Sequence, residues 1–275
     1  VAVELVPEVA ELAGRFFLEA GRPLPQVVIE DARNFLRGTK EQFDVIVGDL
    51  VVPWRYGEGA LYTLEQFSIG RERLAPGGIY CAWLPMFQLN REDFEAILRT
   101  FRAVFPIVSI WRGDFSPNEP ALALIGSPDG DLGLDSETVQ RRLNELRPDR
   151  FNPQLKYARA FWMHLIGMIQ PGAELSDRGG LLNTENRPVV ELRRGKLEPF
   201  AGRALQIWEN ELRRTSAETV KARLGEDAFR GWEAGALMSE FTHLTVERRG
   251  SEAAVVQQRL RTVLGEEIAQ NIFGQ

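Results

Sequence analysis

Hydrophobic positions up to about residue 128 form short continuous runs, which alternate with longer stretches whose apolar residues recur every three or four positions. The short runs predict strands and the longer stretches predict helices. Strands are expected at residues 1–6, 26–30, 43–47, 79–84, 107–111 and 121–125, and helices at 32–37, 61–74, 91–105 and from residue 7 to a stop at Gly21 and Pro23. This alternation predicts an α/β class, a Rossmann-like, doubly wound and mainly parallel sheet covered on both faces.

The pattern becomes mostly helical beyond a polar, glycine-containing stretch at residues 129–133. Helices are expected at residues 136–146, 154–169, 201–214, 217–224 and 252–272, and a loop at 181–193 runs into a β-like stretch at 189–192. We therefore divide the chain into a Rossmann-like domain (1–128), a helical segment with a returning loop packed on it (129–196) and a helical C-terminal extension (197–275). Amphipathic helices usually bury their apolar stripe, so we expect the extension to pack on the sheet.

The amino-acid composition limits which binding partners and which cellular compartment fit this chain. The chain of 275 residues is 44% hydrophobic and carries a formal net charge of -6 without a stripe of Lys and Arg, which disfavours a nucleic-acid partner. The single cysteine, Cys81, excludes an internal disulfide and indicates a reducing, cytoplasmic setting; we expect it to be a small buried side chain. His164 and His243 leave little material for a zinc site and are expected to be hydrogen-bonded core residues. No apolar run approaches the ~20 residues of a membrane helix.

Three acidic residues fall at the ends of predicted strands: Glu4, Asp31 and Asp49. In an open parallel sheet, ligands bind outside the carboxyl ends of the strands. A carboxylate there can accept both hydroxyls of a ribose, and one after the next strand can accept an adenine amino group. Acidic residues are also common wherever a strand end meets solvent, so the ordered set is more informative than any member. It predicts a nucleoside site at one edge of the sheet.

A series of blocks, in order, resembles the spermidine synthase family. These blocks are VELVPEV at 3–9, IEDARNFL at 29–36, FDVIVGD at 43–49, ALYT at 60–63 and LAPGG at 74–78. Four more resemble one branch, the spermidine-synthase-like domains fused behind membrane segments: DLVVPWRY at 49–56, WLPMFQL at 83–89, WRGDF at 111–115 and LNTENRPVVE at 182–191. The resemblance covers residues 1 to about 194. Other methyltransferase-like folds share single blocks, whereas the ordered series is specific.

The resemblance implies a methyltransferase-type sheet and transfer of an aminopropyl group from decarboxylated S-adenosylmethionine to an amine. Carried over by position, Glu4 holds the ribose and Asp31 the adenine edge of the donor. Asp49 orients and deprotonates the amine, and Tyr62 lines the amine pocket. Such catalysis is mostly positioning plus removal of a proton, and no metal is implied.

Departures from the family pattern qualify that expectation. Val52 replaces the second of two aspartates in the catalytic loop, which favours a smaller or less charged acceptor. Val6 replaces an acidic residue, and Glu30 replaces a glycine before Asp31. The first strand and its Gly-rich loop are missing, and the sequence opens without Met inside a strand-like run. We therefore expect an N-terminally truncated domain that is inactive alone and has negligible affinity for the donor, although its longer parent is a transferase.

Several alternatives stay open at this point. Trp54, Tyr56 and Glu58 either close over a substrate or are ordinary loop residues, whereas the segment 183–187 is expected to brace its loop against the sheet. Besides aminopropyl transfer, the fold also fits methyl transfer from S-adenosylmethionine or a non-catalytic ligand-binding or interaction domain. The acceptor amine, a homodimer and membrane segments upstream in the parent protein are all left undetermined.

Overall fold

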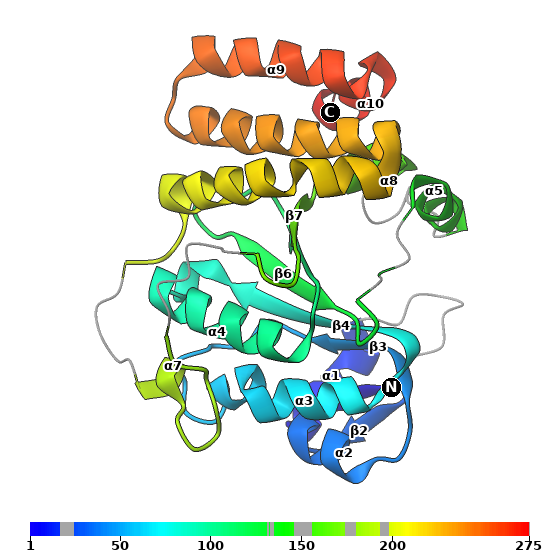
Figure 1. Cartoon of the computed structure of the whole chain (residues 1–275), viewed down its shortest axis with the longest axis vertical. Helices are drawn as coiled ribbons and strands as arrows, with labels where there is room; N and C mark the ends of the chain where they lie inside the picture. The colour runs from blue at the N-terminus through cyan, green and yellow to red at the C-terminus, as the bar shows by residue number, and fades with distance from the viewer. Residues whose placement is uncertain are drawn as a thin grey trace.

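The computed structural model describes residues 1–16, 25–130, 132, 135–145, 156–173, 180–192 and 198–274. Two sheets lie below a layer of long helices (Figure 1). The smaller sheet pairs β1 (Ala2–Glu4) with β2 (Val27–Ile29), and the larger has the order β3 (Phe43–Gly48), β4 (Leu74–Pro85), β6 (Ala121–Gly126), β5 (Val108–Arg112), β7 (Leu165–Ile169). The predicted strands are thus confirmed, and the α/β class is confirmed with them. The expected helix stop at Gly21 and Pro23 lies outside the described residues.

Pairing within the sheets is mixed rather than mainly parallel. β1 runs parallel to β2 and β3 runs parallel to β4, whereas the pairs β4–β6, β5–β6 and β5–β7 are antiparallel. The connection from β5 to β6, residues 113–120, holds no helix and is too short for a parallel crossover. Strand β6 therefore returns antiparallel to β5.

An open edge separates the two sheets. The apolar run of β3 is typical of a buried parallel strand, yet Val45 and Val47 are 53% and 57% exposed. Among the described residues, no strand pairs with the outer edge of β3, and β1 pairs only with β2. A strand with a continuous apolar run is normally covered by neighbours on both sides, so this edge leaves apolar surface uncovered.

Two helices cover one face of the larger sheet, in front of it in Figure 1. α3 (Leu64–Glu72) begins where the Thr63 hydroxyl accepts the Gln66 N–H, and α4 (Arg91–Val104) begins where Asn90 Oδ1 accepts the Asp93 N–H at 2.8 Å, as predicted for Asn90. Their apolar faces meet the sheet in an aromatic core. This core includes Phe67, Tyr80, Phe94, Phe101 and Phe105.

The stretch expected as one helix at residues 154–169 is instead the helix α6 (Ala158–Trp162) followed by strand β7. Residues 154 and 155 lie outside the described part of the chain. A short apolar run fits a buried strand as well as a helix, and pairing with β5 decides the outcome. Gly167 permits a close approach of α8, because a Cβ there would lie 2.6 Å from Ser216 Oγ. His164 therefore sits in a turn before a strand, not on a helix.

The β-like stretch expected at residues 189–192 is also wrong, since α7 (Val189–Leu192) forms there. Two of its three apolar residues, Val189 and Val190, are β-branched, which explains the sequence prediction. The Val190 N–H donates to the Asn183 side chain, which fixes the turn, and Val190 is fully buried in the core. The remaining helices before the C-terminal extension are α1 (Pro7–Phe16) and α2 (Ala32–Gly38), and α5 (Ser136–Glu145), which contacts α6 and α8.

The C-terminal extension is a helical layer packed on the sheet, as expected. α8 (Gly202–Val246) bends back on itself at Gly225, whose φ of 78° suits glycine, and α9 (Gly250–Leu264) and α10 (Glu266–Phe273) follow. The half of α8 after Gly225 was not predicted. From the first half, Leu205, Trp208 and Leu212 join the core of the sheet. None of the described helices is both long and apolar enough to cross a bilayer.

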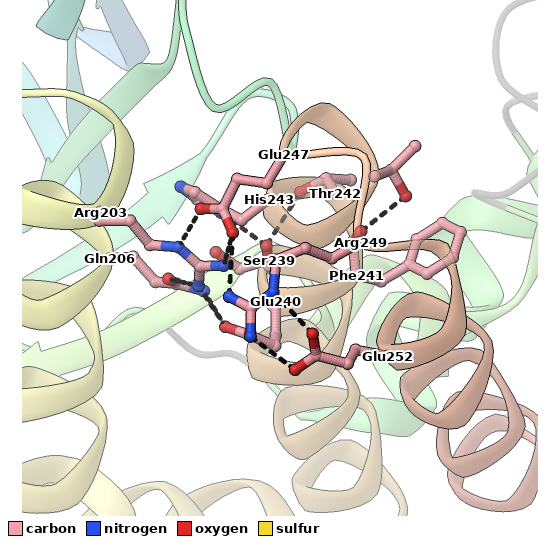
Figure 2. A network of polar contacts seen from close by, with 11 residues as sticks. Arg203, Gln206, Ser239, Glu240, Phe241, Thr242, His243, Glu247, Arg249 and Glu252 are labelled. Carbon is pink, nitrogen blue, oxygen red and sulfur yellow. Dashed lines mark hydrogen bonds and ion pairs between the residues drawn. The ribbon is translucent and has the colours of Figure 1, made fainter.

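Polar contacts clamp the two ends of α8 together (Figure 2). Arg203, near its start, donates 2.6 Å hydrogen bonds to Glu240 and to Glu247 beyond its end. Hydrogen bonds from Arg203 lower the pKa of Glu247 to about 2, so the clamp stays charged into acidic pH. The two halves of α8 are therefore joined at the end opposite Gly225.

Candidate active site

Glu4 and Asp31 follow neighbouring parallel strands of the smaller sheet. Glu4 pairs in register with Ile29, two residues before Asp31. One oxygen of each carboxylate binds its own backbone: Glu4 Oε1 accepts the Val6 N–H at 2.8 Å, and Asp31 Oδ1 caps α2 by accepting the N–H groups of Arg33 and Asn34. The second oxygen of each carboxylate receives no hydrogen bond from the described residues. The pair thus keeps acceptor capacity for hydroxyl or amino groups of a ligand.

Asp49 belongs to the other sheet, directly after β3. Its Oδ1 accepts the Leu50 N–H at 2.7 Å, and within the described ranges no cation is paired with it. Gly48 lies in register with Ala82, so Asp49 ends its strand beside the carboxyl end of β4. Because β1 and β3 are in separate sheets, convergence of Asp49 with Glu4 and Asp31 remains a prediction.

Tyr62 is buried in the 3-10 turn at Gly59–Tyr62, at the end of the loop that begins at Asp49. Its hydroxyl donates to the Trp83 carbonyl at 2.8 Å. Burial raises the pKa of Tyr62, and the nearby Tyr80, Asp49 and Glu58 raise it further, against a backbone hydrogen bond from Val51. Tyr62 is therefore a neutral hydrogen-bond donor that ties the loop after β3 to the end of β4, and it is not a base.

Two glutamates hold the backbone of the loop between Asp49 and Tyr62. Glu58 Oε2 accepts the Val52 N–H at 2.7 Å, and Glu191 Oε1, from α7, accepts the Gly57 N–H at 3.0 Å. Trp54 and Tyr56 are exposed in this loop. No local pattern pointed to Glu191, because its partner is 134 positions away and only the fold brings them together.

Asn183 braces the same loop, whereas the returning segment was expected to brace its own loop against the sheet. Its backbone N–H donates to Thr100 Oγ1 at 2.8 Å, and its buried side-chain Nδ2 donates to the carbonyls of Tyr62 and Gly59. Its Oδ1 accepts the Val190 N–H. Glu185 adds an ion pair with Arg37 on α2. One residue thus links the turn at Tyr62 and α7 through its side chain and α4 through its backbone.

Replacing Asn183 with alanine is expected to destabilise the protein by about 1–3 kcal/mol, because it leaves buried backbone groups unpaired. Urea denaturation checks the loss, and hydrogen exchange at Val190 reports on local opening. Asn186→Ala, at an exposed position of the same segment, is the matched control and should change stability by less than about 0.5 kcal/mol. Equal stability of the two variants would contradict the bracing role.

The remaining candidate residues are one cysteine and two histidines, and their contacts indicate a structural role. Burial, and then the charge of Asp49, raise the pKa of the Cys81 thiol to about 11, so it is a protonated core residue. His164 Nδ1 lies 3.0 Å from the Arg112 carbonyl oxygen, and buried His243 Nδ1 lies 2.7 Å from that of Ser239. The expectations for Cys81 and His243 are confirmed, whereas His164 is only half-buried and lies in a turn. Across the described part of the chain, no cluster of three or more His, Cys, Asp or Glu side chains is arranged to hold a metal.

The fold and the carboxylates after its parallel strands define a Rossmann-like α/β domain with a helical extension. Comparison with known proteins shows what this domain is similar to. Residues 16–111, less than half of the chain, match the family model described as the spermine/spermidine synthase domain.

Curated relatives share between about a quarter and two fifths of their aligned residues with the chain. The polyamine aminopropyltransferase of Korarchaeum cryptofilum is 28% identical over 146 residues, 50% of this chain and 44% of that protein. Thermospermine synthase ACAULIS5 of Arabidopsis thaliana is 28% identical over 139 residues (49% and 40%), and the polyamine aminopropyltransferase of Mycobacterium tuberculosis is 39% identical over 111 residues (38% and 21%). The chain thus spans less than half the length of these relatives.

A solved spermidine synthase in complex with the transition-state analogue AdoDATO is 25% identical, with a TM-score of 0.44 over 56% of this chain and 53% of that one. The spermidine synthase from Thermotoga maritima is 23% identical, with a TM-score of 0.41 over 56% and 50%.

Proposed function

We propose that the whole protein transfers an aminopropyl group from decarboxylated S-adenosylmethionine to a small amine, with Asp49 as the acceptor carboxylate. The observation that carries this proposal is the position of Asp49: an exposed carboxylate without a cationic partner, at the end of a parallel strand in the family-matching segment. Such a group attracts an ammonium ion and can take its proton.

The proposed reaction is a single displacement. The neutral amine nitrogen attacks the aminopropyl carbon next to the sulfonium, the new C–N bond forms as the C–S bond breaks, and the electron pair stays on sulfur. The leaving group is then a neutral thioether nucleoside. The proton lost by the amine passes to Asp49 and on to solvent. Glu4 and Asp31 supply acceptors for the ribose hydroxyls and the adenine amino group of the donor.

Methyl transfer from S-adenosylmethionine is the second candidate, and Val52 is the observation in its favour. A diamine carries two positive charges, and an apolar side chain at this position removes one carboxylate that the family uses. A methyl acceptor needs no second anionic group. The same carboxylates at Glu4 and Asp31 fit either nucleoside donor.

The test is turnover by the whole protein with each donor, followed by mass spectrometry of the nucleoside product. We expect the thioether from the decarboxylated donor, and Asp49→Asn should lower the rate by about 100-fold or more. Asp44→Asn, an exposed position of the same strand, is the control and should keep the wild-type rate. Methylated product, absence of turnover with both donors, or full activity of Asp49→Asn would overturn the proposal.

A further inference from the structure

A cavity of about 400 Å³ lies on the face of the larger sheet that α3 and α4 leave uncovered. Trp83 on β4, Ala123 on β6 and Trp111 on β5 form one row across the three strands and line this cavity. Successive residues of a strand point to opposite faces, so the neighbouring Leu84 and Leu122 point instead into the aromatic core under the two helices. The cavity is therefore separate from that core.

The lining is mainly apolar, and three of its side chains are aromatic. Phe161 from α6 lies with its ring centroid 5.0 Å from that of Trp111. Trp111 Nε1 donates to Ser109 Oγ at 2.9 Å, so the polar atom of this indole is already bonded. Gly113 allows the Trp83 ring to lie close to the backbone, because a Cβ there would be 3.0 Å from the ring. The cavity thus offers ring carbon to a ligand.

The charge near the cavity is positive and buried. Arg112 is the charged residue of the lining, but its side chain is only 1% exposed, and its Nε lies 2.8 Å from Glu209 Oε1. Arg213 is a second buried cation of this cluster, which interacts with both Glu209 and Arg112. Two guanidinium groups with one carboxylate leave an excess of positive charge, which disfavours a cationic ligand.

His164 also lines the cavity and supplies a hydrogen-bond acceptor. Its Nδ1 lies 3.0 Å from the Arg112 carbonyl oxygen, which only accepts, so Nδ1 carries the proton of the neutral ring. Burial lowers the pKa of His164 and the charge of Arg112 lowers it further, against the Arg112 carbonyl and the charge of Asp114. The ring is therefore neutral at pH 7. Its Nε2 is then an acceptor, which receives no hydrogen bond from the described residues.

We propose that this cavity binds a small, flat, neutral aromatic molecule that donates one hydrogen bond to His164 Nε2. Trp83, Trp111 and Phe161 favour an aromatic ligand, because offset or edge-to-face ring pairs gain more than their buried area alone provides. The volume is within the range of about 300–1,000 Å³ that is usual for ligand pockets. An ammonium ligand meets the positive charge of the Arg112 cluster, and a carboxylate meets an acceptor. The site goes beyond aminopropyl transfer and does not rest on it.

Calorimetric titration of the chain with indole tests the proposal. We expect saturable binding with a dissociation constant at or below about 1 mM. 1-Methylindole, which lacks the N–H group, should bind about 3- to 10-fold more weakly, because one hydrogen bond is lost. Tryptamine, which adds an ammonium group, should also bind more weakly than indole. His164→Phe keeps a ring but removes the acceptor, so indole and 1-methylindole should bind this variant equally.

A second variant places the ligand in the cavity. Ala123→Leu fills its floor and should weaken indole binding by about tenfold or more. Ala254→Leu, the same substitution at an exposed position of α9, is the control and should bind as the wild type does.

Several results would overturn the proposal: no saturable binding of indole, wild-type affinity in folded Ala123→Leu, 1-methylindole bound as tightly as indole, or tryptamine bound more tightly. If Ala123→Leu does not fold, His164→Phe decides. Equal affinities for the two indoles then support the site, and a retained preference for indole overturns it.

Discussion

Replacing Glu209 with glutamine is expected to lower the free energy of unfolding by about 3–5 kcal/mol. Glu209 Oε1 is 2.8 Å from Arg112 Nε, and both side chains are only 1% exposed. Arg213 is a second buried cation beside them: burial lowers its pKa to about 10, and the charge of Glu209 acts against that shift. Removing the one carboxylate leaves two guanidinium groups buried without a countercharge.

Urea denaturation of the variant checks this loss. Glu211→Gln, on the exposed side of the same helix, is the matched control and should change stability by less than about 0.5 kcal/mol. Adding Arg213→Met to Glu209→Gln should recover part of the loss, because one of the two uncompensated cations is then gone. If Glu209→Gln unfolds at the same urea concentration as the wild type, the buried ion pair does not stabilise the packing of α8 against β5.

Replacing Phe101 with alanine is expected to destabilise the sheet and its covering helices by about 3–5 kcal/mol. Phe101 on α4 is fully buried, with its ring centroid 5.0 Å from that of Phe67 and 4.6 Å from that of Phe105. The side chain also packs against Gly126, where even a Cβ would lie 3.0 Å from the ring. Alanine leaves a cavity that its rigid neighbours cannot fill.

Denaturation curves for a short series test this second prediction. Phe101→Leu retains most of the apolar volume and should lose less than the alanine variant. Phe87→Ala, at a partly exposed position after β4, should also lose less. A Phe101→Ala loss below about 1 kcal/mol would contradict a tightly packed core at this point.

The sequence predicted the strands and most helices because their hydrophobic periods are local properties. Pairing partners are not local, so the antiparallel end of the sheet and the strand at Leu165–Ile169 were missed. The second half of α8 was missed for a related reason: Gly231 and Gly235 weaken its helical pattern. In the fold they permit contact, since a Cβ on Gly235 would lie 2.1 Å from the Met163 carbonyl oxygen.

The site was predictable in part. Asp31 and Asp49 were found because acidic residues directly after apolar runs are visible in the sequence, and Glu4 followed from the same reasoning. The roles of Glu58 and Glu191 were not predictable, because each depends on where a loop backbone folds. That Tyr62 lines the amine pocket stays a prediction, and only the structure shows that its hydroxyl is buried against the Trp83 carbonyl.

The placement of Glu4 and Asp31 in one sheet and Asp49 in the other bears on how the chain would bind the proposed donor. Within the described ranges, no strand and no glycine-rich loop lie between β1 and β3 to approach the methionine-derived part of a nucleoside. A nucleoside donor would then be held by contacts to its ribose and adenine alone. These contacts would have to offset the entropy lost on association, which costs about 4–15 kcal/mol. Asp49, the proposed acceptor carboxylate, is in contrast present at the end of β3.

Calorimetric titration of this 275-residue chain tests the account most directly. We expect saturable binding of 1,4-diaminobutane that is lost in Asp49→Asn, and no micromolar binding of decarboxylated S-adenosylmethionine or S-adenosylmethionine. Micromolar affinity for either nucleoside, or diamine binding that does not depend on Asp49, would contradict it.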